Sequence, residues 1–477
     1  MMRTMEDSPI RFGTDGWRAL IADTFTFTNV RACIRATAEH FAEARGTDRP
    51  IVVGYDTRFL SGDFALEAAR VLAAAGFRVQ LATQASPTPA ASLRVVHEGA
   101  CGGVVITSSH NPFNWNGVKV KPHYGGSASP EIVEDIERRI PAILQQGEPP
   151  LARPDDPAIT RFDPIPGYLE TLAQLVDVEQ IRSAGLRIAF DPMYGTGSGL
   201  LSRLLEGGTT TVHEVHADRN PLFPGIRAPE PIESNLGDVM AAMRDDNFDV
   251  GIALDGDSDR VGLLDEHGGY VDQLRTFALL TQYLLGERGQ RGAIVKSLTT
   301  TDMARLLAEH YDVPFFETPV GFKHIGPLMM EHDALLGGEE SGGYGFRGHL
   351  PERDGILAAL FLLDYVARTG KRPSALLDEV FAITGPHHYR RIDLELEPGA
   401  NDEVRARLDE ANPDEIAGQP VISSDRVDGW RFHIDSGWLL LRLSGTEPLV
   451  RVYTEVRDES LVTPVLEAGK SLAGVDS

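Results

Sequence analysis

The sequence predicts an α/β protein built from several domains. Short runs of β-branched residues alternate with Ala- and Leu-rich helical stretches, which is the pattern of βαβ units. This order restarts after Pro-rich stretches near 148–157 and 384–387 and again near 265. A chain of 477 residues is also too long for one hydrophobic core. We therefore expect three similar α/β domains over 1–155, 156–265 and 266–385, followed by a smaller α+β domain over 386–477.

Five apolar runs are the predicted central strands, and each precedes a polar or Gly-rich turn. In α/β folds the active site lies in the loops after the carboxyl ends of the strands, so these turns are the candidate site loops. The five runs are Ile51–Val53, Val104–Ile106, Leu186–Phe190, Gly251–Leu254 and Ala293–Val295.

Composition restricts the classes of partner. A formal charge of −25 and a pI near 4.9 oppose nucleic acid and anionic membranes, which bind clustered Lys and Arg. The chain has no apolar run of about 18 residues, and its N-terminus lacks an apolar secretory core. Cys33 and Cys101 are too few for a disulfide framework. We expect a cytoplasmic enzyme in which any anionic substrate binds a local basic pocket.

The segment Asp255-Gly-Asp-Ser-Asp-Arg260 predicts a divalent-cation site at the end of a strand. Side chains two apart on an extended backbone point the same way, so Asp255, Asp257 and Asp259 can converge on one cation. Three other interpretations stay open: a solvated acidic turn, a calcium loop, and a phosphatase loop with Asp255 as nucleophile. Arg260 stands where a calcium loop requires Gly, and Asp259 where the phosphatase loop expects Thr or Val.

A second polar loop follows Val104–Ile106 and reads Thr107-Ser-Ser-His-Asn-Pro112. A hydroxyl beside His110 in a closed turn suits a nucleophile or a phosphate acceptor, although such hydroxyls also cap backbone amides. Lys119 follows in a chain with only six lysines, which favours an acid/base or phosphate-binding role. Arg18, in the tight turn Phe12–Arg18, is more often a surface cation when taken alone.

Three further loops carry groups suited to a sugar phosphate. Gly337–Gly343 offers carboxylates and a hydroxyl on a flexible backbone, which suits sugar hydroxyls, and Thr318–His324 is a second Gly turn. The strand Leu439–Leu443 leads into Ser444, with Arg442 before it and Arg451 after it. Guanidinium groups with hydroxyls and backbone amides bind a phosphate dianion.

Together and in this order, the motifs resemble those of the α-D-phosphohexomutase family over nearly the whole chain. The resemblance implies four domains with mixed sheets in the first three, arranged around a central cleft, and a C-terminal domain that can rotate over it. It also implies exchange of phosphate between the 1- and 6-positions of a hexose through a phosphoserine. The expected cofactors are one Mg²⁺ per chain and glucose 1,6-bisphosphate as activator and intermediate. The expected partners are small sugar phosphates, for a monomer or a small homo-oligomer.

The resemblance also implies a role for each motif residue. Ser109 would carry the phosphoryl group, and it would bind the metal together with Asp255, Asp257 and Asp259. Lys119, Arg18, Arg260 and His110 would form the rest of the catalytic set. The substrate would be bound by Gly321, Lys323, Glu339, Ser341, Arg442, Ser444, Gly445, Thr446 and Arg451.

One position departs from the family pattern. Several members carry a His two residues after the sugar-loop Ser, where this chain has Gly343. The second acid/base is therefore unassigned, with Lys323, His324 and His349 as candidates. The Glu-Glu-Ser order and Val320–Lys323 look more like phosphoglucomutases, which makes glucose phosphate the first expected substrate. Phosphomannomutase and phosphoglucosamine mutase are the nearest alternatives, and a sugar-phosphate phosphatase or a non-catalytic binding protein are more distant ones.

Overall fold

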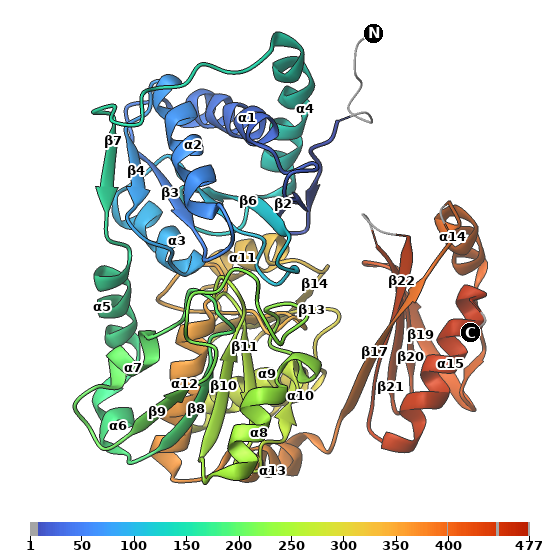
Figure 1. Cartoon of the computed structure of the whole chain (residues 1–477). Coiled ribbons are helices and arrows are strands. Elements are labelled where there is room, and N and C mark those ends of the chain that lie inside the picture. Colours follow the sequence, from blue (N-terminus) through green and yellow to red (C-terminus); the bar gives the residue numbers. More distant parts are fainter. Residues whose placement is uncertain (1–7, 398, 445–447, 476–477) are drawn as a thin grey trace.

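The computed structural model describes residues 8–397, 399–444 and 448–475. Within these residues the strands form four separate sheets, one in each of four consecutive domains (Figure 1). The first three sheets combine a parallel centre with antiparallel strands, and the fourth is antiparallel throughout. The predicted fold class is therefore confirmed.

The first domain has a seven-stranded sheet in the order β1-β2-β6-β5-β3-β4-β7. Strands β3 and β5 are parallel and almost wholly buried because helices cover both faces, as their apolar sequences require. The elements are β1 (Phe12–Gly13), β2 (Gly16–Leu20), α1 (Phe27–Arg45), β3 (Ile51–Tyr55), α2 (Ser61–Ala74), β4 (Val79–Ala82), α3 (Thr88–His97), β5 (Gly102–Ile106), β6 (Trp115–Pro122), α4 (Pro130–Gln146) and β7 (Ile159–Phe162).

The second domain has a five-stranded sheet in the order β12-β11-β10-β8-β9. Its central strand β10 is parallel to β8 and forms an antiparallel hairpin with β11. The elements are α5 (Ile165–Leu175), α6 (Val178–Ser183), β8 (Arg187–Asp191), α7 (Leu200–Leu205), β9 (Thr211–Glu214), η2 (Glu233–Asn235), α8 (Gly237–Asp245), β10 (Val250–Leu254), β11 (Val261–Leu264) and β12 (Tyr270–Val271).

The third domain has a four-stranded sheet in the order β14-β13-β15-β16. The elements are α9 (Gln273–Gln282), η3 (Tyr283–Glu287), β13 (Ile294–Ser297), α10 (Met303–His310), β14 (Phe315–Thr318), α11 (Phe322–Glu331), β15 (Leu336–Gly338), β16 (Tyr344–Phe346), α12 (Gly355–Thr369) and α13 (Pro373–Thr384). Helix α12 is apolar on almost every side because it packs against both the second and the third domain. The two domains therefore share one hydrophobic core.

The fourth domain has a six-stranded sheet in the order β17-β22-β21-β20-β19-β18, with two helices. Its elements are β17 (His388–Glu395), α14 (Asn401–Glu410), β18 (Glu415–Ile416), β19 (Gln419–Asp425), β20 (Trp430–Ile434), β21 (Gly437–Leu443), β22 (Leu449–Val456), η4 (Glu459–Leu461) and α15 (Val462–Ala473). It forms its own core and stands beside the rest of the molecule (Figure 1).

The five predicted strands correspond to β3, β5, β8, β10 and β13. Strand β7 adds to the first sheet although it follows residue 155, where the sequence predicts the first domain to end. Strand β12 likewise adds to the second sheet beyond residue 265. Both sheets recruit an edge strand from the segment that leads into the next domain.

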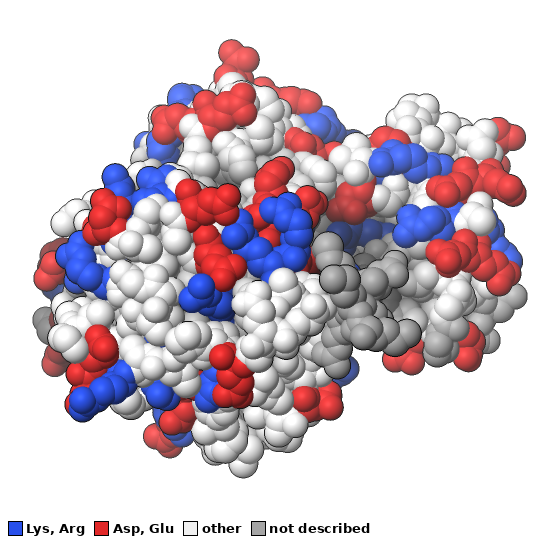
Figure 2. Space-filling view, turned by 90° about the horizontal axis from the view of Figure 1, so that it is seen from above, with Lys and Arg blue, Asp and Glu red and all other residues white. Residues whose placement is uncertain are grey.

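The fourth domain contacts the third through an apolar cluster that includes Trp438, Leu440 and Leu298. Beside this cluster Arg431 on β20 donates to Glu317 on β14 at 2.5 Å. Seen from above, the surface is hollowed between the C-terminal domain and the rest of the molecule, and Lys and Arg side chains are visible there (Figure 2). Among the described residues, no helix combines the length and apolar character that crossing a membrane requires.

Candidate active site

Ser109 lies in the loop after β5 with its side chain fully buried. Its φ of 49° is unusual for a residue other than Gly, and Thr107 Oγ1 holds the loop by accepting from the Ser109 amide at 2.9 Å. The Ser109 hydroxyl donates to Asp255 Oδ2 at 2.6 Å, although the two residues are 146 apart in the chain. The serine loop of the first domain therefore meets the aspartate loop of the second.

Arg58 holds the loop at residues 109–112 through its main chain and is itself completely buried. Its guanidinium donates to the main-chain oxygens of Ser109 and Asn111, both at 2.6 Å, and of Pro112 at 2.8 Å. Its own charge is balanced by Asp56 at 3.3 Å. One buried arginine thus replaces the hydrogen bonds that this irregular loop cannot make within itself.

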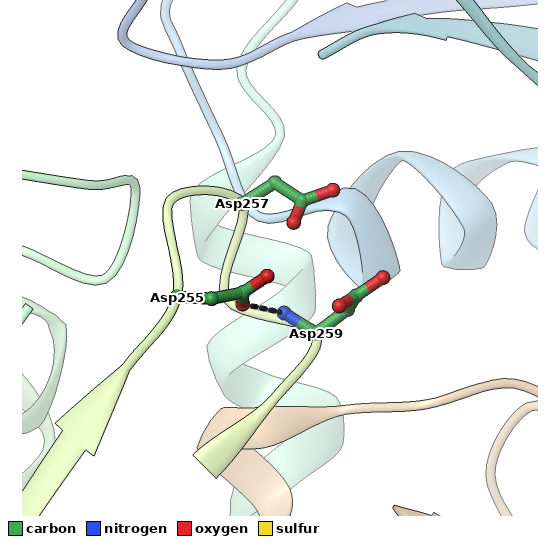
Figure 3. Close-up of side chains that lie close together, drawn as sticks. All are labelled: Asp255, Asp257 and Asp259. Carbon is green, nitrogen blue, oxygen red and sulfur yellow. Dashed lines mark hydrogen bonds between the residues drawn. The ribbon is translucent and has the colours of Figure 1, made fainter. Parts of the chain in front are cut away.

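Asp255, Asp257 and Asp259 are fully buried, and each offers an oxygen within 4.8 Å of the others (Figure 3). Asp255 Oδ1 shapes the loop by accepting from the amides of Asp259 and Arg260 at 3.0 and 3.1 Å. Asp257 Oδ1 and Asp259 Oδ1 are buried without a hydrogen-bond partner in the described part of the chain. Burial and the neighbouring Asp259 and Asp257 charges raise the pKa of Asp255 well above its ordinary value. Orphaned carboxylate oxygens under mutual repulsion fit a hard divalent cation.

Two of the open interpretations of this loop are wrong. A solvated acidic turn is excluded because all three carboxylates are buried. A helix-flanked calcium loop is excluded because the segment connects the antiparallel strands β10 and β11.

Lys119 reaches the aspartate loop from β6 of the first domain and is 1% exposed. Its ammonium lies 2.7 Å from Asp259, 2.9 Å from Asp257 and 2.9 Å from Asp15. Burial alone would lower the pKa of Lys119, but the charges of Asp15, Asp257 and Asp259 raise it above its ordinary value. Three carboxylates from two domains therefore surround the Lys119 ammonium.

Arg18, His110 and Arg260 complete the cationic surroundings of Ser109. Arg18 on β2 donates to Asn111 Oδ1 at 2.9 Å, and His110 Nδ1 lies 3.3 Å from Ser109 Oγ. Burial lowers the pKa of His110 well below its ordinary value, and Arg260 and Arg18 lower it further. Arg260 lies 3.4 Å from Glu230 and 3.9 Å from Asp259. The structure thus brings all five predicted catalytic residues to one centre.

Arg353 joins this centre to the predicted sugar loop. Its buried guanidinium contacts Asp15 of the first domain, Asp259 of the second at 3.2 Å and Glu339 of the third at 3.4 Å. Burial would lower the pKa of Arg353, but Asp259, Asp15 and the adjacent Glu352 raise it well above its ordinary value. Arg353 also fills the space beside Gly343, where an added Cβ would lie 2.2 Å from Arg353 Cδ. The position that carries His in several family members therefore faces an arginine.

The other sugar-loop residues lie close to this arginine or at the adjoining turn. Burial raises the pKa of Glu339, and Ser341 Oγ is buried without a hydrogen-bond partner within the described ranges. Gly321 has a φ of 123°, and a Cβ there would lie 3.1 Å from Thr14 of the first domain. Lys323 follows in the first turn of α11.

The two candidate histidines differ in their surroundings. The side chain of His349 is fully buried and contacts Asp354, the residue that caps α12, at 2.9 Å. His324 lies at the start of α11, where burial and then Lys323 lower its pKa.

The predicted phosphate-binding residues form a second group on the C-terminal sheet. Arg442 on β21 lies directly opposite Arg451 on β22, and Ser444 follows β21 with its amide donating to Leu449 O at 2.9 Å. Arg442 Nε donates to Asp428 at 2.9 Å, and Arg451 Nε lies 3.6 Å from Asp393. Gly445 and Thr446 lie outside the described residues.

Family models match the chain in all four domains. They are described as phosphoglucomutase/phosphomannomutase α/β/α domain I over residues 9–147, domain II over 166–269, domain III over 272–383 and the C-terminal domain over 403–468. The chain belongs to the phosphoglucomutase/phosphomannomutase family. The resemblance to the α-D-phosphohexomutases is thereby confirmed.

Relatives of this mutase family align over nearly the full chain. A phosphoglucomutase/phosphomannomutase of Thermococcus kodakarensis is 31% identical over 97% of this chain and 98% of its own. A phosphoglucosamine mutase of Frankia alni is 34% identical over 94% of this chain and 95% of its own. The crystal structure of a putative phosphomannomutase from Thermus thermophilus is 35% identical, with a TM-score of 0.85 and coverage of 98% of this chain and 99% of that one. These matches support phosphohexomutase activity and leave the choice of hexose open.

Sequence reasoning missed three residues of this mutase centre. Arg58 follows β3 in the segment Asp56-Thr-Arg58, and the rule that site residues follow strands could have found it. Asp15 belongs to the turn Phe12–Arg18, whereas Arg353 lies outside every motif named above. Only their mutual contact gives them a shared position. Local spacing carries no signal for a contact across 338 residues.

Proposed function

We propose that this protein interconverts hexose 1-phosphate and hexose 6-phosphate, with glucose phosphate as its first substrate, through a phosphoserine at Ser109. The observation that carries this proposal is the hydrogen bond of 2.6 Å between Ser109 Oγ and Asp255 Oδ2. It joins a hydroxyl that can carry the phosphoryl group to a buried aspartate cluster suited to a cation. Positive charge around Ser109 would come from Lys119, Arg18 and Arg260.

In the first half-reaction the free hydroxyl of a sugar monophosphate attacks the phosphorus on Ser109. A P–O bond forms to the sugar oxygen, the P–O bond to Ser109 Oγ breaks, and the sugar hydroxyl proton ends on Ser109 Oγ. The bisphosphate then turns over in the cleft and returns its other phosphate to Ser109. Glucose 1,6-bisphosphate is therefore both intermediate and activator. His110 Nδ1 lies 3.3 Å from Ser109 Oγ, so its ring would help to fix the position of this oxygen during the transfer.

The buried aspartates would hold one Mg²⁺ together with an oxygen of phosphorylated Ser109. Their fit rests on the orphaned oxygens of Asp257 and Asp259. When bound, the cation would neutralise charge on the transferring phosphoryl group.

Substrate binding is divided between two domains. In the third domain Glu339 and Ser341 would bind sugar hydroxyls, with Gly321 and Lys323 at the adjoining turn. In the fourth, Arg442 and Arg451 would bind the phosphate that is not transferred, with Ser444, Gly445 and Thr446.

Because Arg353 occupies the space beside Gly343, the missing imidazole is replaced by a guanidinium that cannot exchange a proton near neutral pH. The domain ranges 1–155, 156–265, 266–385 and 386–477 belong to the same proposal, except that β7 and β12 extend the first and second sheets past residues 155 and 265. A cytoplasmic location and a monomer or small homo-oligomer are also proposed.

The test is to incubate the purified protein with glucose 1-phosphate, Mg²⁺ and a trace of glucose 1,6-bisphosphate and to measure glucose 6-phosphate. Ser109→Ala should abolish product formation and should remove one phosphate from the intact mass. An Asp255-based phosphatase would stay active in Ser109→Ala and would release inorganic phosphate. A binding protein would show neither reaction.

Phosphoglucosamine mutase activity is the second candidate because the Frankia alni relative, named a phosphoglucosamine mutase, is 34% identical over 94% of this chain. Glucosamine 6-phosphate, glucose 6-phosphate and mannose 6-phosphate should be compared by kcat/KM under the same conditions. Faster turnover of glucosamine 6-phosphate would overturn the choice of glucose.

A further inference from the structure

Asp428 lies in the turn between β19 and β20 and uses both carboxylate oxygens on different parts of the molecule. Its Oδ1 accepts from Arg442 Nε at 2.9 Å, within the fourth domain. Its Oδ2 accepts from the main-chain amide of Val320 at 2.9 Å, in the third domain. One carboxylate therefore joins the proposed phosphate-binding arginine to the turn that precedes the proposed sugar-binding residues.

The position of Arg442 explains why a carboxylate is needed beside it. Arg442 and Arg451 are directly opposite across the antiparallel strands β21 and β22, and like charges in this relation repel. Asp428 offsets that repulsion and holds the guanidinium through Nε. Arg442 also has a side-chain hydrogen bond with Tyr453, and a phosphate would accept from the amino groups of the same guanidinium.

The position of Val320 gives the second half of the relation. It precedes Gly321, whose φ of 123° starts the turn into α11 and which lies against Thr14 of the first domain. The main chain at Val320 thus leads directly into the residue that adjoins the first domain.

We propose that Asp428 is a positioning residue that sets the separation between the phosphate held by the fourth domain and the sugar held by the third. The inference rests on the proposed function, because it takes Arg442 as the phosphate ligand. A carboxylate with both oxygens in use keeps Arg442 and the Val320 turn in one arrangement before substrate binds. Ordering them only on binding would cost affinity.

A second charged contact between the same domains supplies the control. Glu317 accepts from Arg431 at 2.5 Å and contacts Lys296 at 2.8 Å. Within the described residues, none of these three side chains contacts Arg442. Glu317→Gln therefore weakens the attachment of the two domains without disturbing the phosphate-binding arginine.

The experiment measures equilibrium binding of glucose 6-phosphate by calorimetry in the Ser109→Ala background, where no phosphoryl transfer occurs. Asp428→Asn should raise Kd about tenfold because it loses the charged hydrogen bond to Arg442, whereas Glu317→Gln should stay within about twofold of the parent. Asp428→Glu keeps the charge but not the two distances, and it should also bind more weakly. Unfolding midpoints confirm that each variant is folded.

A double-mutant cycle shows whether Asp428 acts through Arg442. In an Arg442→Gln background the further change Asp428→Asn should alter Kd by less than about twofold. In steady-state assays of protein that keeps Ser109, Asp428→Asn should raise KM more than it lowers kcat.

An unchanged or lower Kd for Asp428→Asn, or full additivity in the cycle, would overturn the inference. A wild-type protein that turns over no hexose phosphate would instead contradict the proposed function. The binding measurements decide the role of Asp428 in either case.

Discussion

A Cβ atom on Gly343 would lie 2.2 Å from Cδ of Arg353, so these two positions share a single space. Arg353 cannot simply move aside, because its guanidinium is held by carboxylates from three domains. Arg353 can therefore occupy this position only because residue 343 has no side chain.

This relationship predicts that Gly343→Ala impairs the protein although it adds only a methyl group. Displacing Arg353 should lower the free energy of unfolding by about 1–3 kcal/mol and reduce kcat/KM about tenfold. Denaturant unfolding and steady-state kinetics measure the two effects. Gly167→Ala is the matched control, since nothing lies within 4 Å of its added Cβ inside α5. If Gly343→Ala costs as much in an Arg353→Ala background as in the wild type, the two residues do not share a space.

Arg353 itself should prove essential for both stability and turnover. Arg353→Met leaves Asp15, Asp259 and Glu339 buried without this cation, which should lower the free energy of unfolding by about 3–5 kcal/mol and kcat/KM by about 100-fold or more. Arg353→Lys keeps the charge but cannot reach three carboxylates with one planar group, so its loss should be intermediate. The exposed Arg372, paired with Asp249, is the control, and Arg372→Met should cost less than about 1 kcal/mol. Equal losses for Met and Lys at 353 would show that its charge is not what matters.

Metal affinity should depend on the phosphorylation of Ser109. The proposed site consists of three aspartates and an oxygen of the phosphoserine, so Mg²⁺ should bind at least about tenfold more tightly to the phosphorylated protein. Calorimetry on phosphorylated and Ser109→Ala protein, with intact mass to establish the phosphate content, measures the difference. Asp257→Asn should weaken binding in both forms. Equal Mg²⁺ affinity in the two forms would show that the phosphate on Ser109 is not a ligand of the metal.

His216 should make stability depend on pH through its contacts with Asp191, at the end of β8, and Asp238, in α8. Its two ring nitrogens contact Asp191 and Asp238, both at 3.0 Å, and two carboxylate partners require the charged imidazolium. The hydrogen bond to Asp191 raises the pKa of His216 while burial opposes the rise.

A raised pKa in the folded state means that this contribution is complete below the ordinary value of about 6.5 and disappears as pH rises through the folded value. Compared with wild type, His216→Gln should therefore lose more unfolding free energy at about pH 6 than at about pH 9. Urea unfolding at both pH values tests this, with the exposed His97→Gln as control. A loss independent of pH would show that His216 is not charged in this contact.

The fold class was predictable because it depends on local rules, whereas the roles of the site residues came from the resemblance to the family. Alternating apolar runs mark strands β3, β5, β8, β10 and β13, and chemistry-bearing residues follow the carboxyl ends of several of them. The edge strands β7 and β12 escaped prediction because an edge strand is defined by its neighbour and not by its own few residues. Arg58 and Arg353 escaped for a similar reason, since their partners are distant in the chain.

The sequence by itself determined which chemical groups are available: a serine loop, three aspartates on alternate residues and a strand that ends in an arginine and a serine. Only the tertiary structure decided that Ser109 donates to Asp255, that Lys119 enters the aspartate loop and that Asp428 joins Arg442 to Val320. The order of residues is local information, but the three aspartates converge in the turn between β10 and β11, where Ser258 has a φ of 60°, and not along an extended strand. Contacts between domains follow from how whole hydrophobic faces pack, and that information is spread over the entire chain.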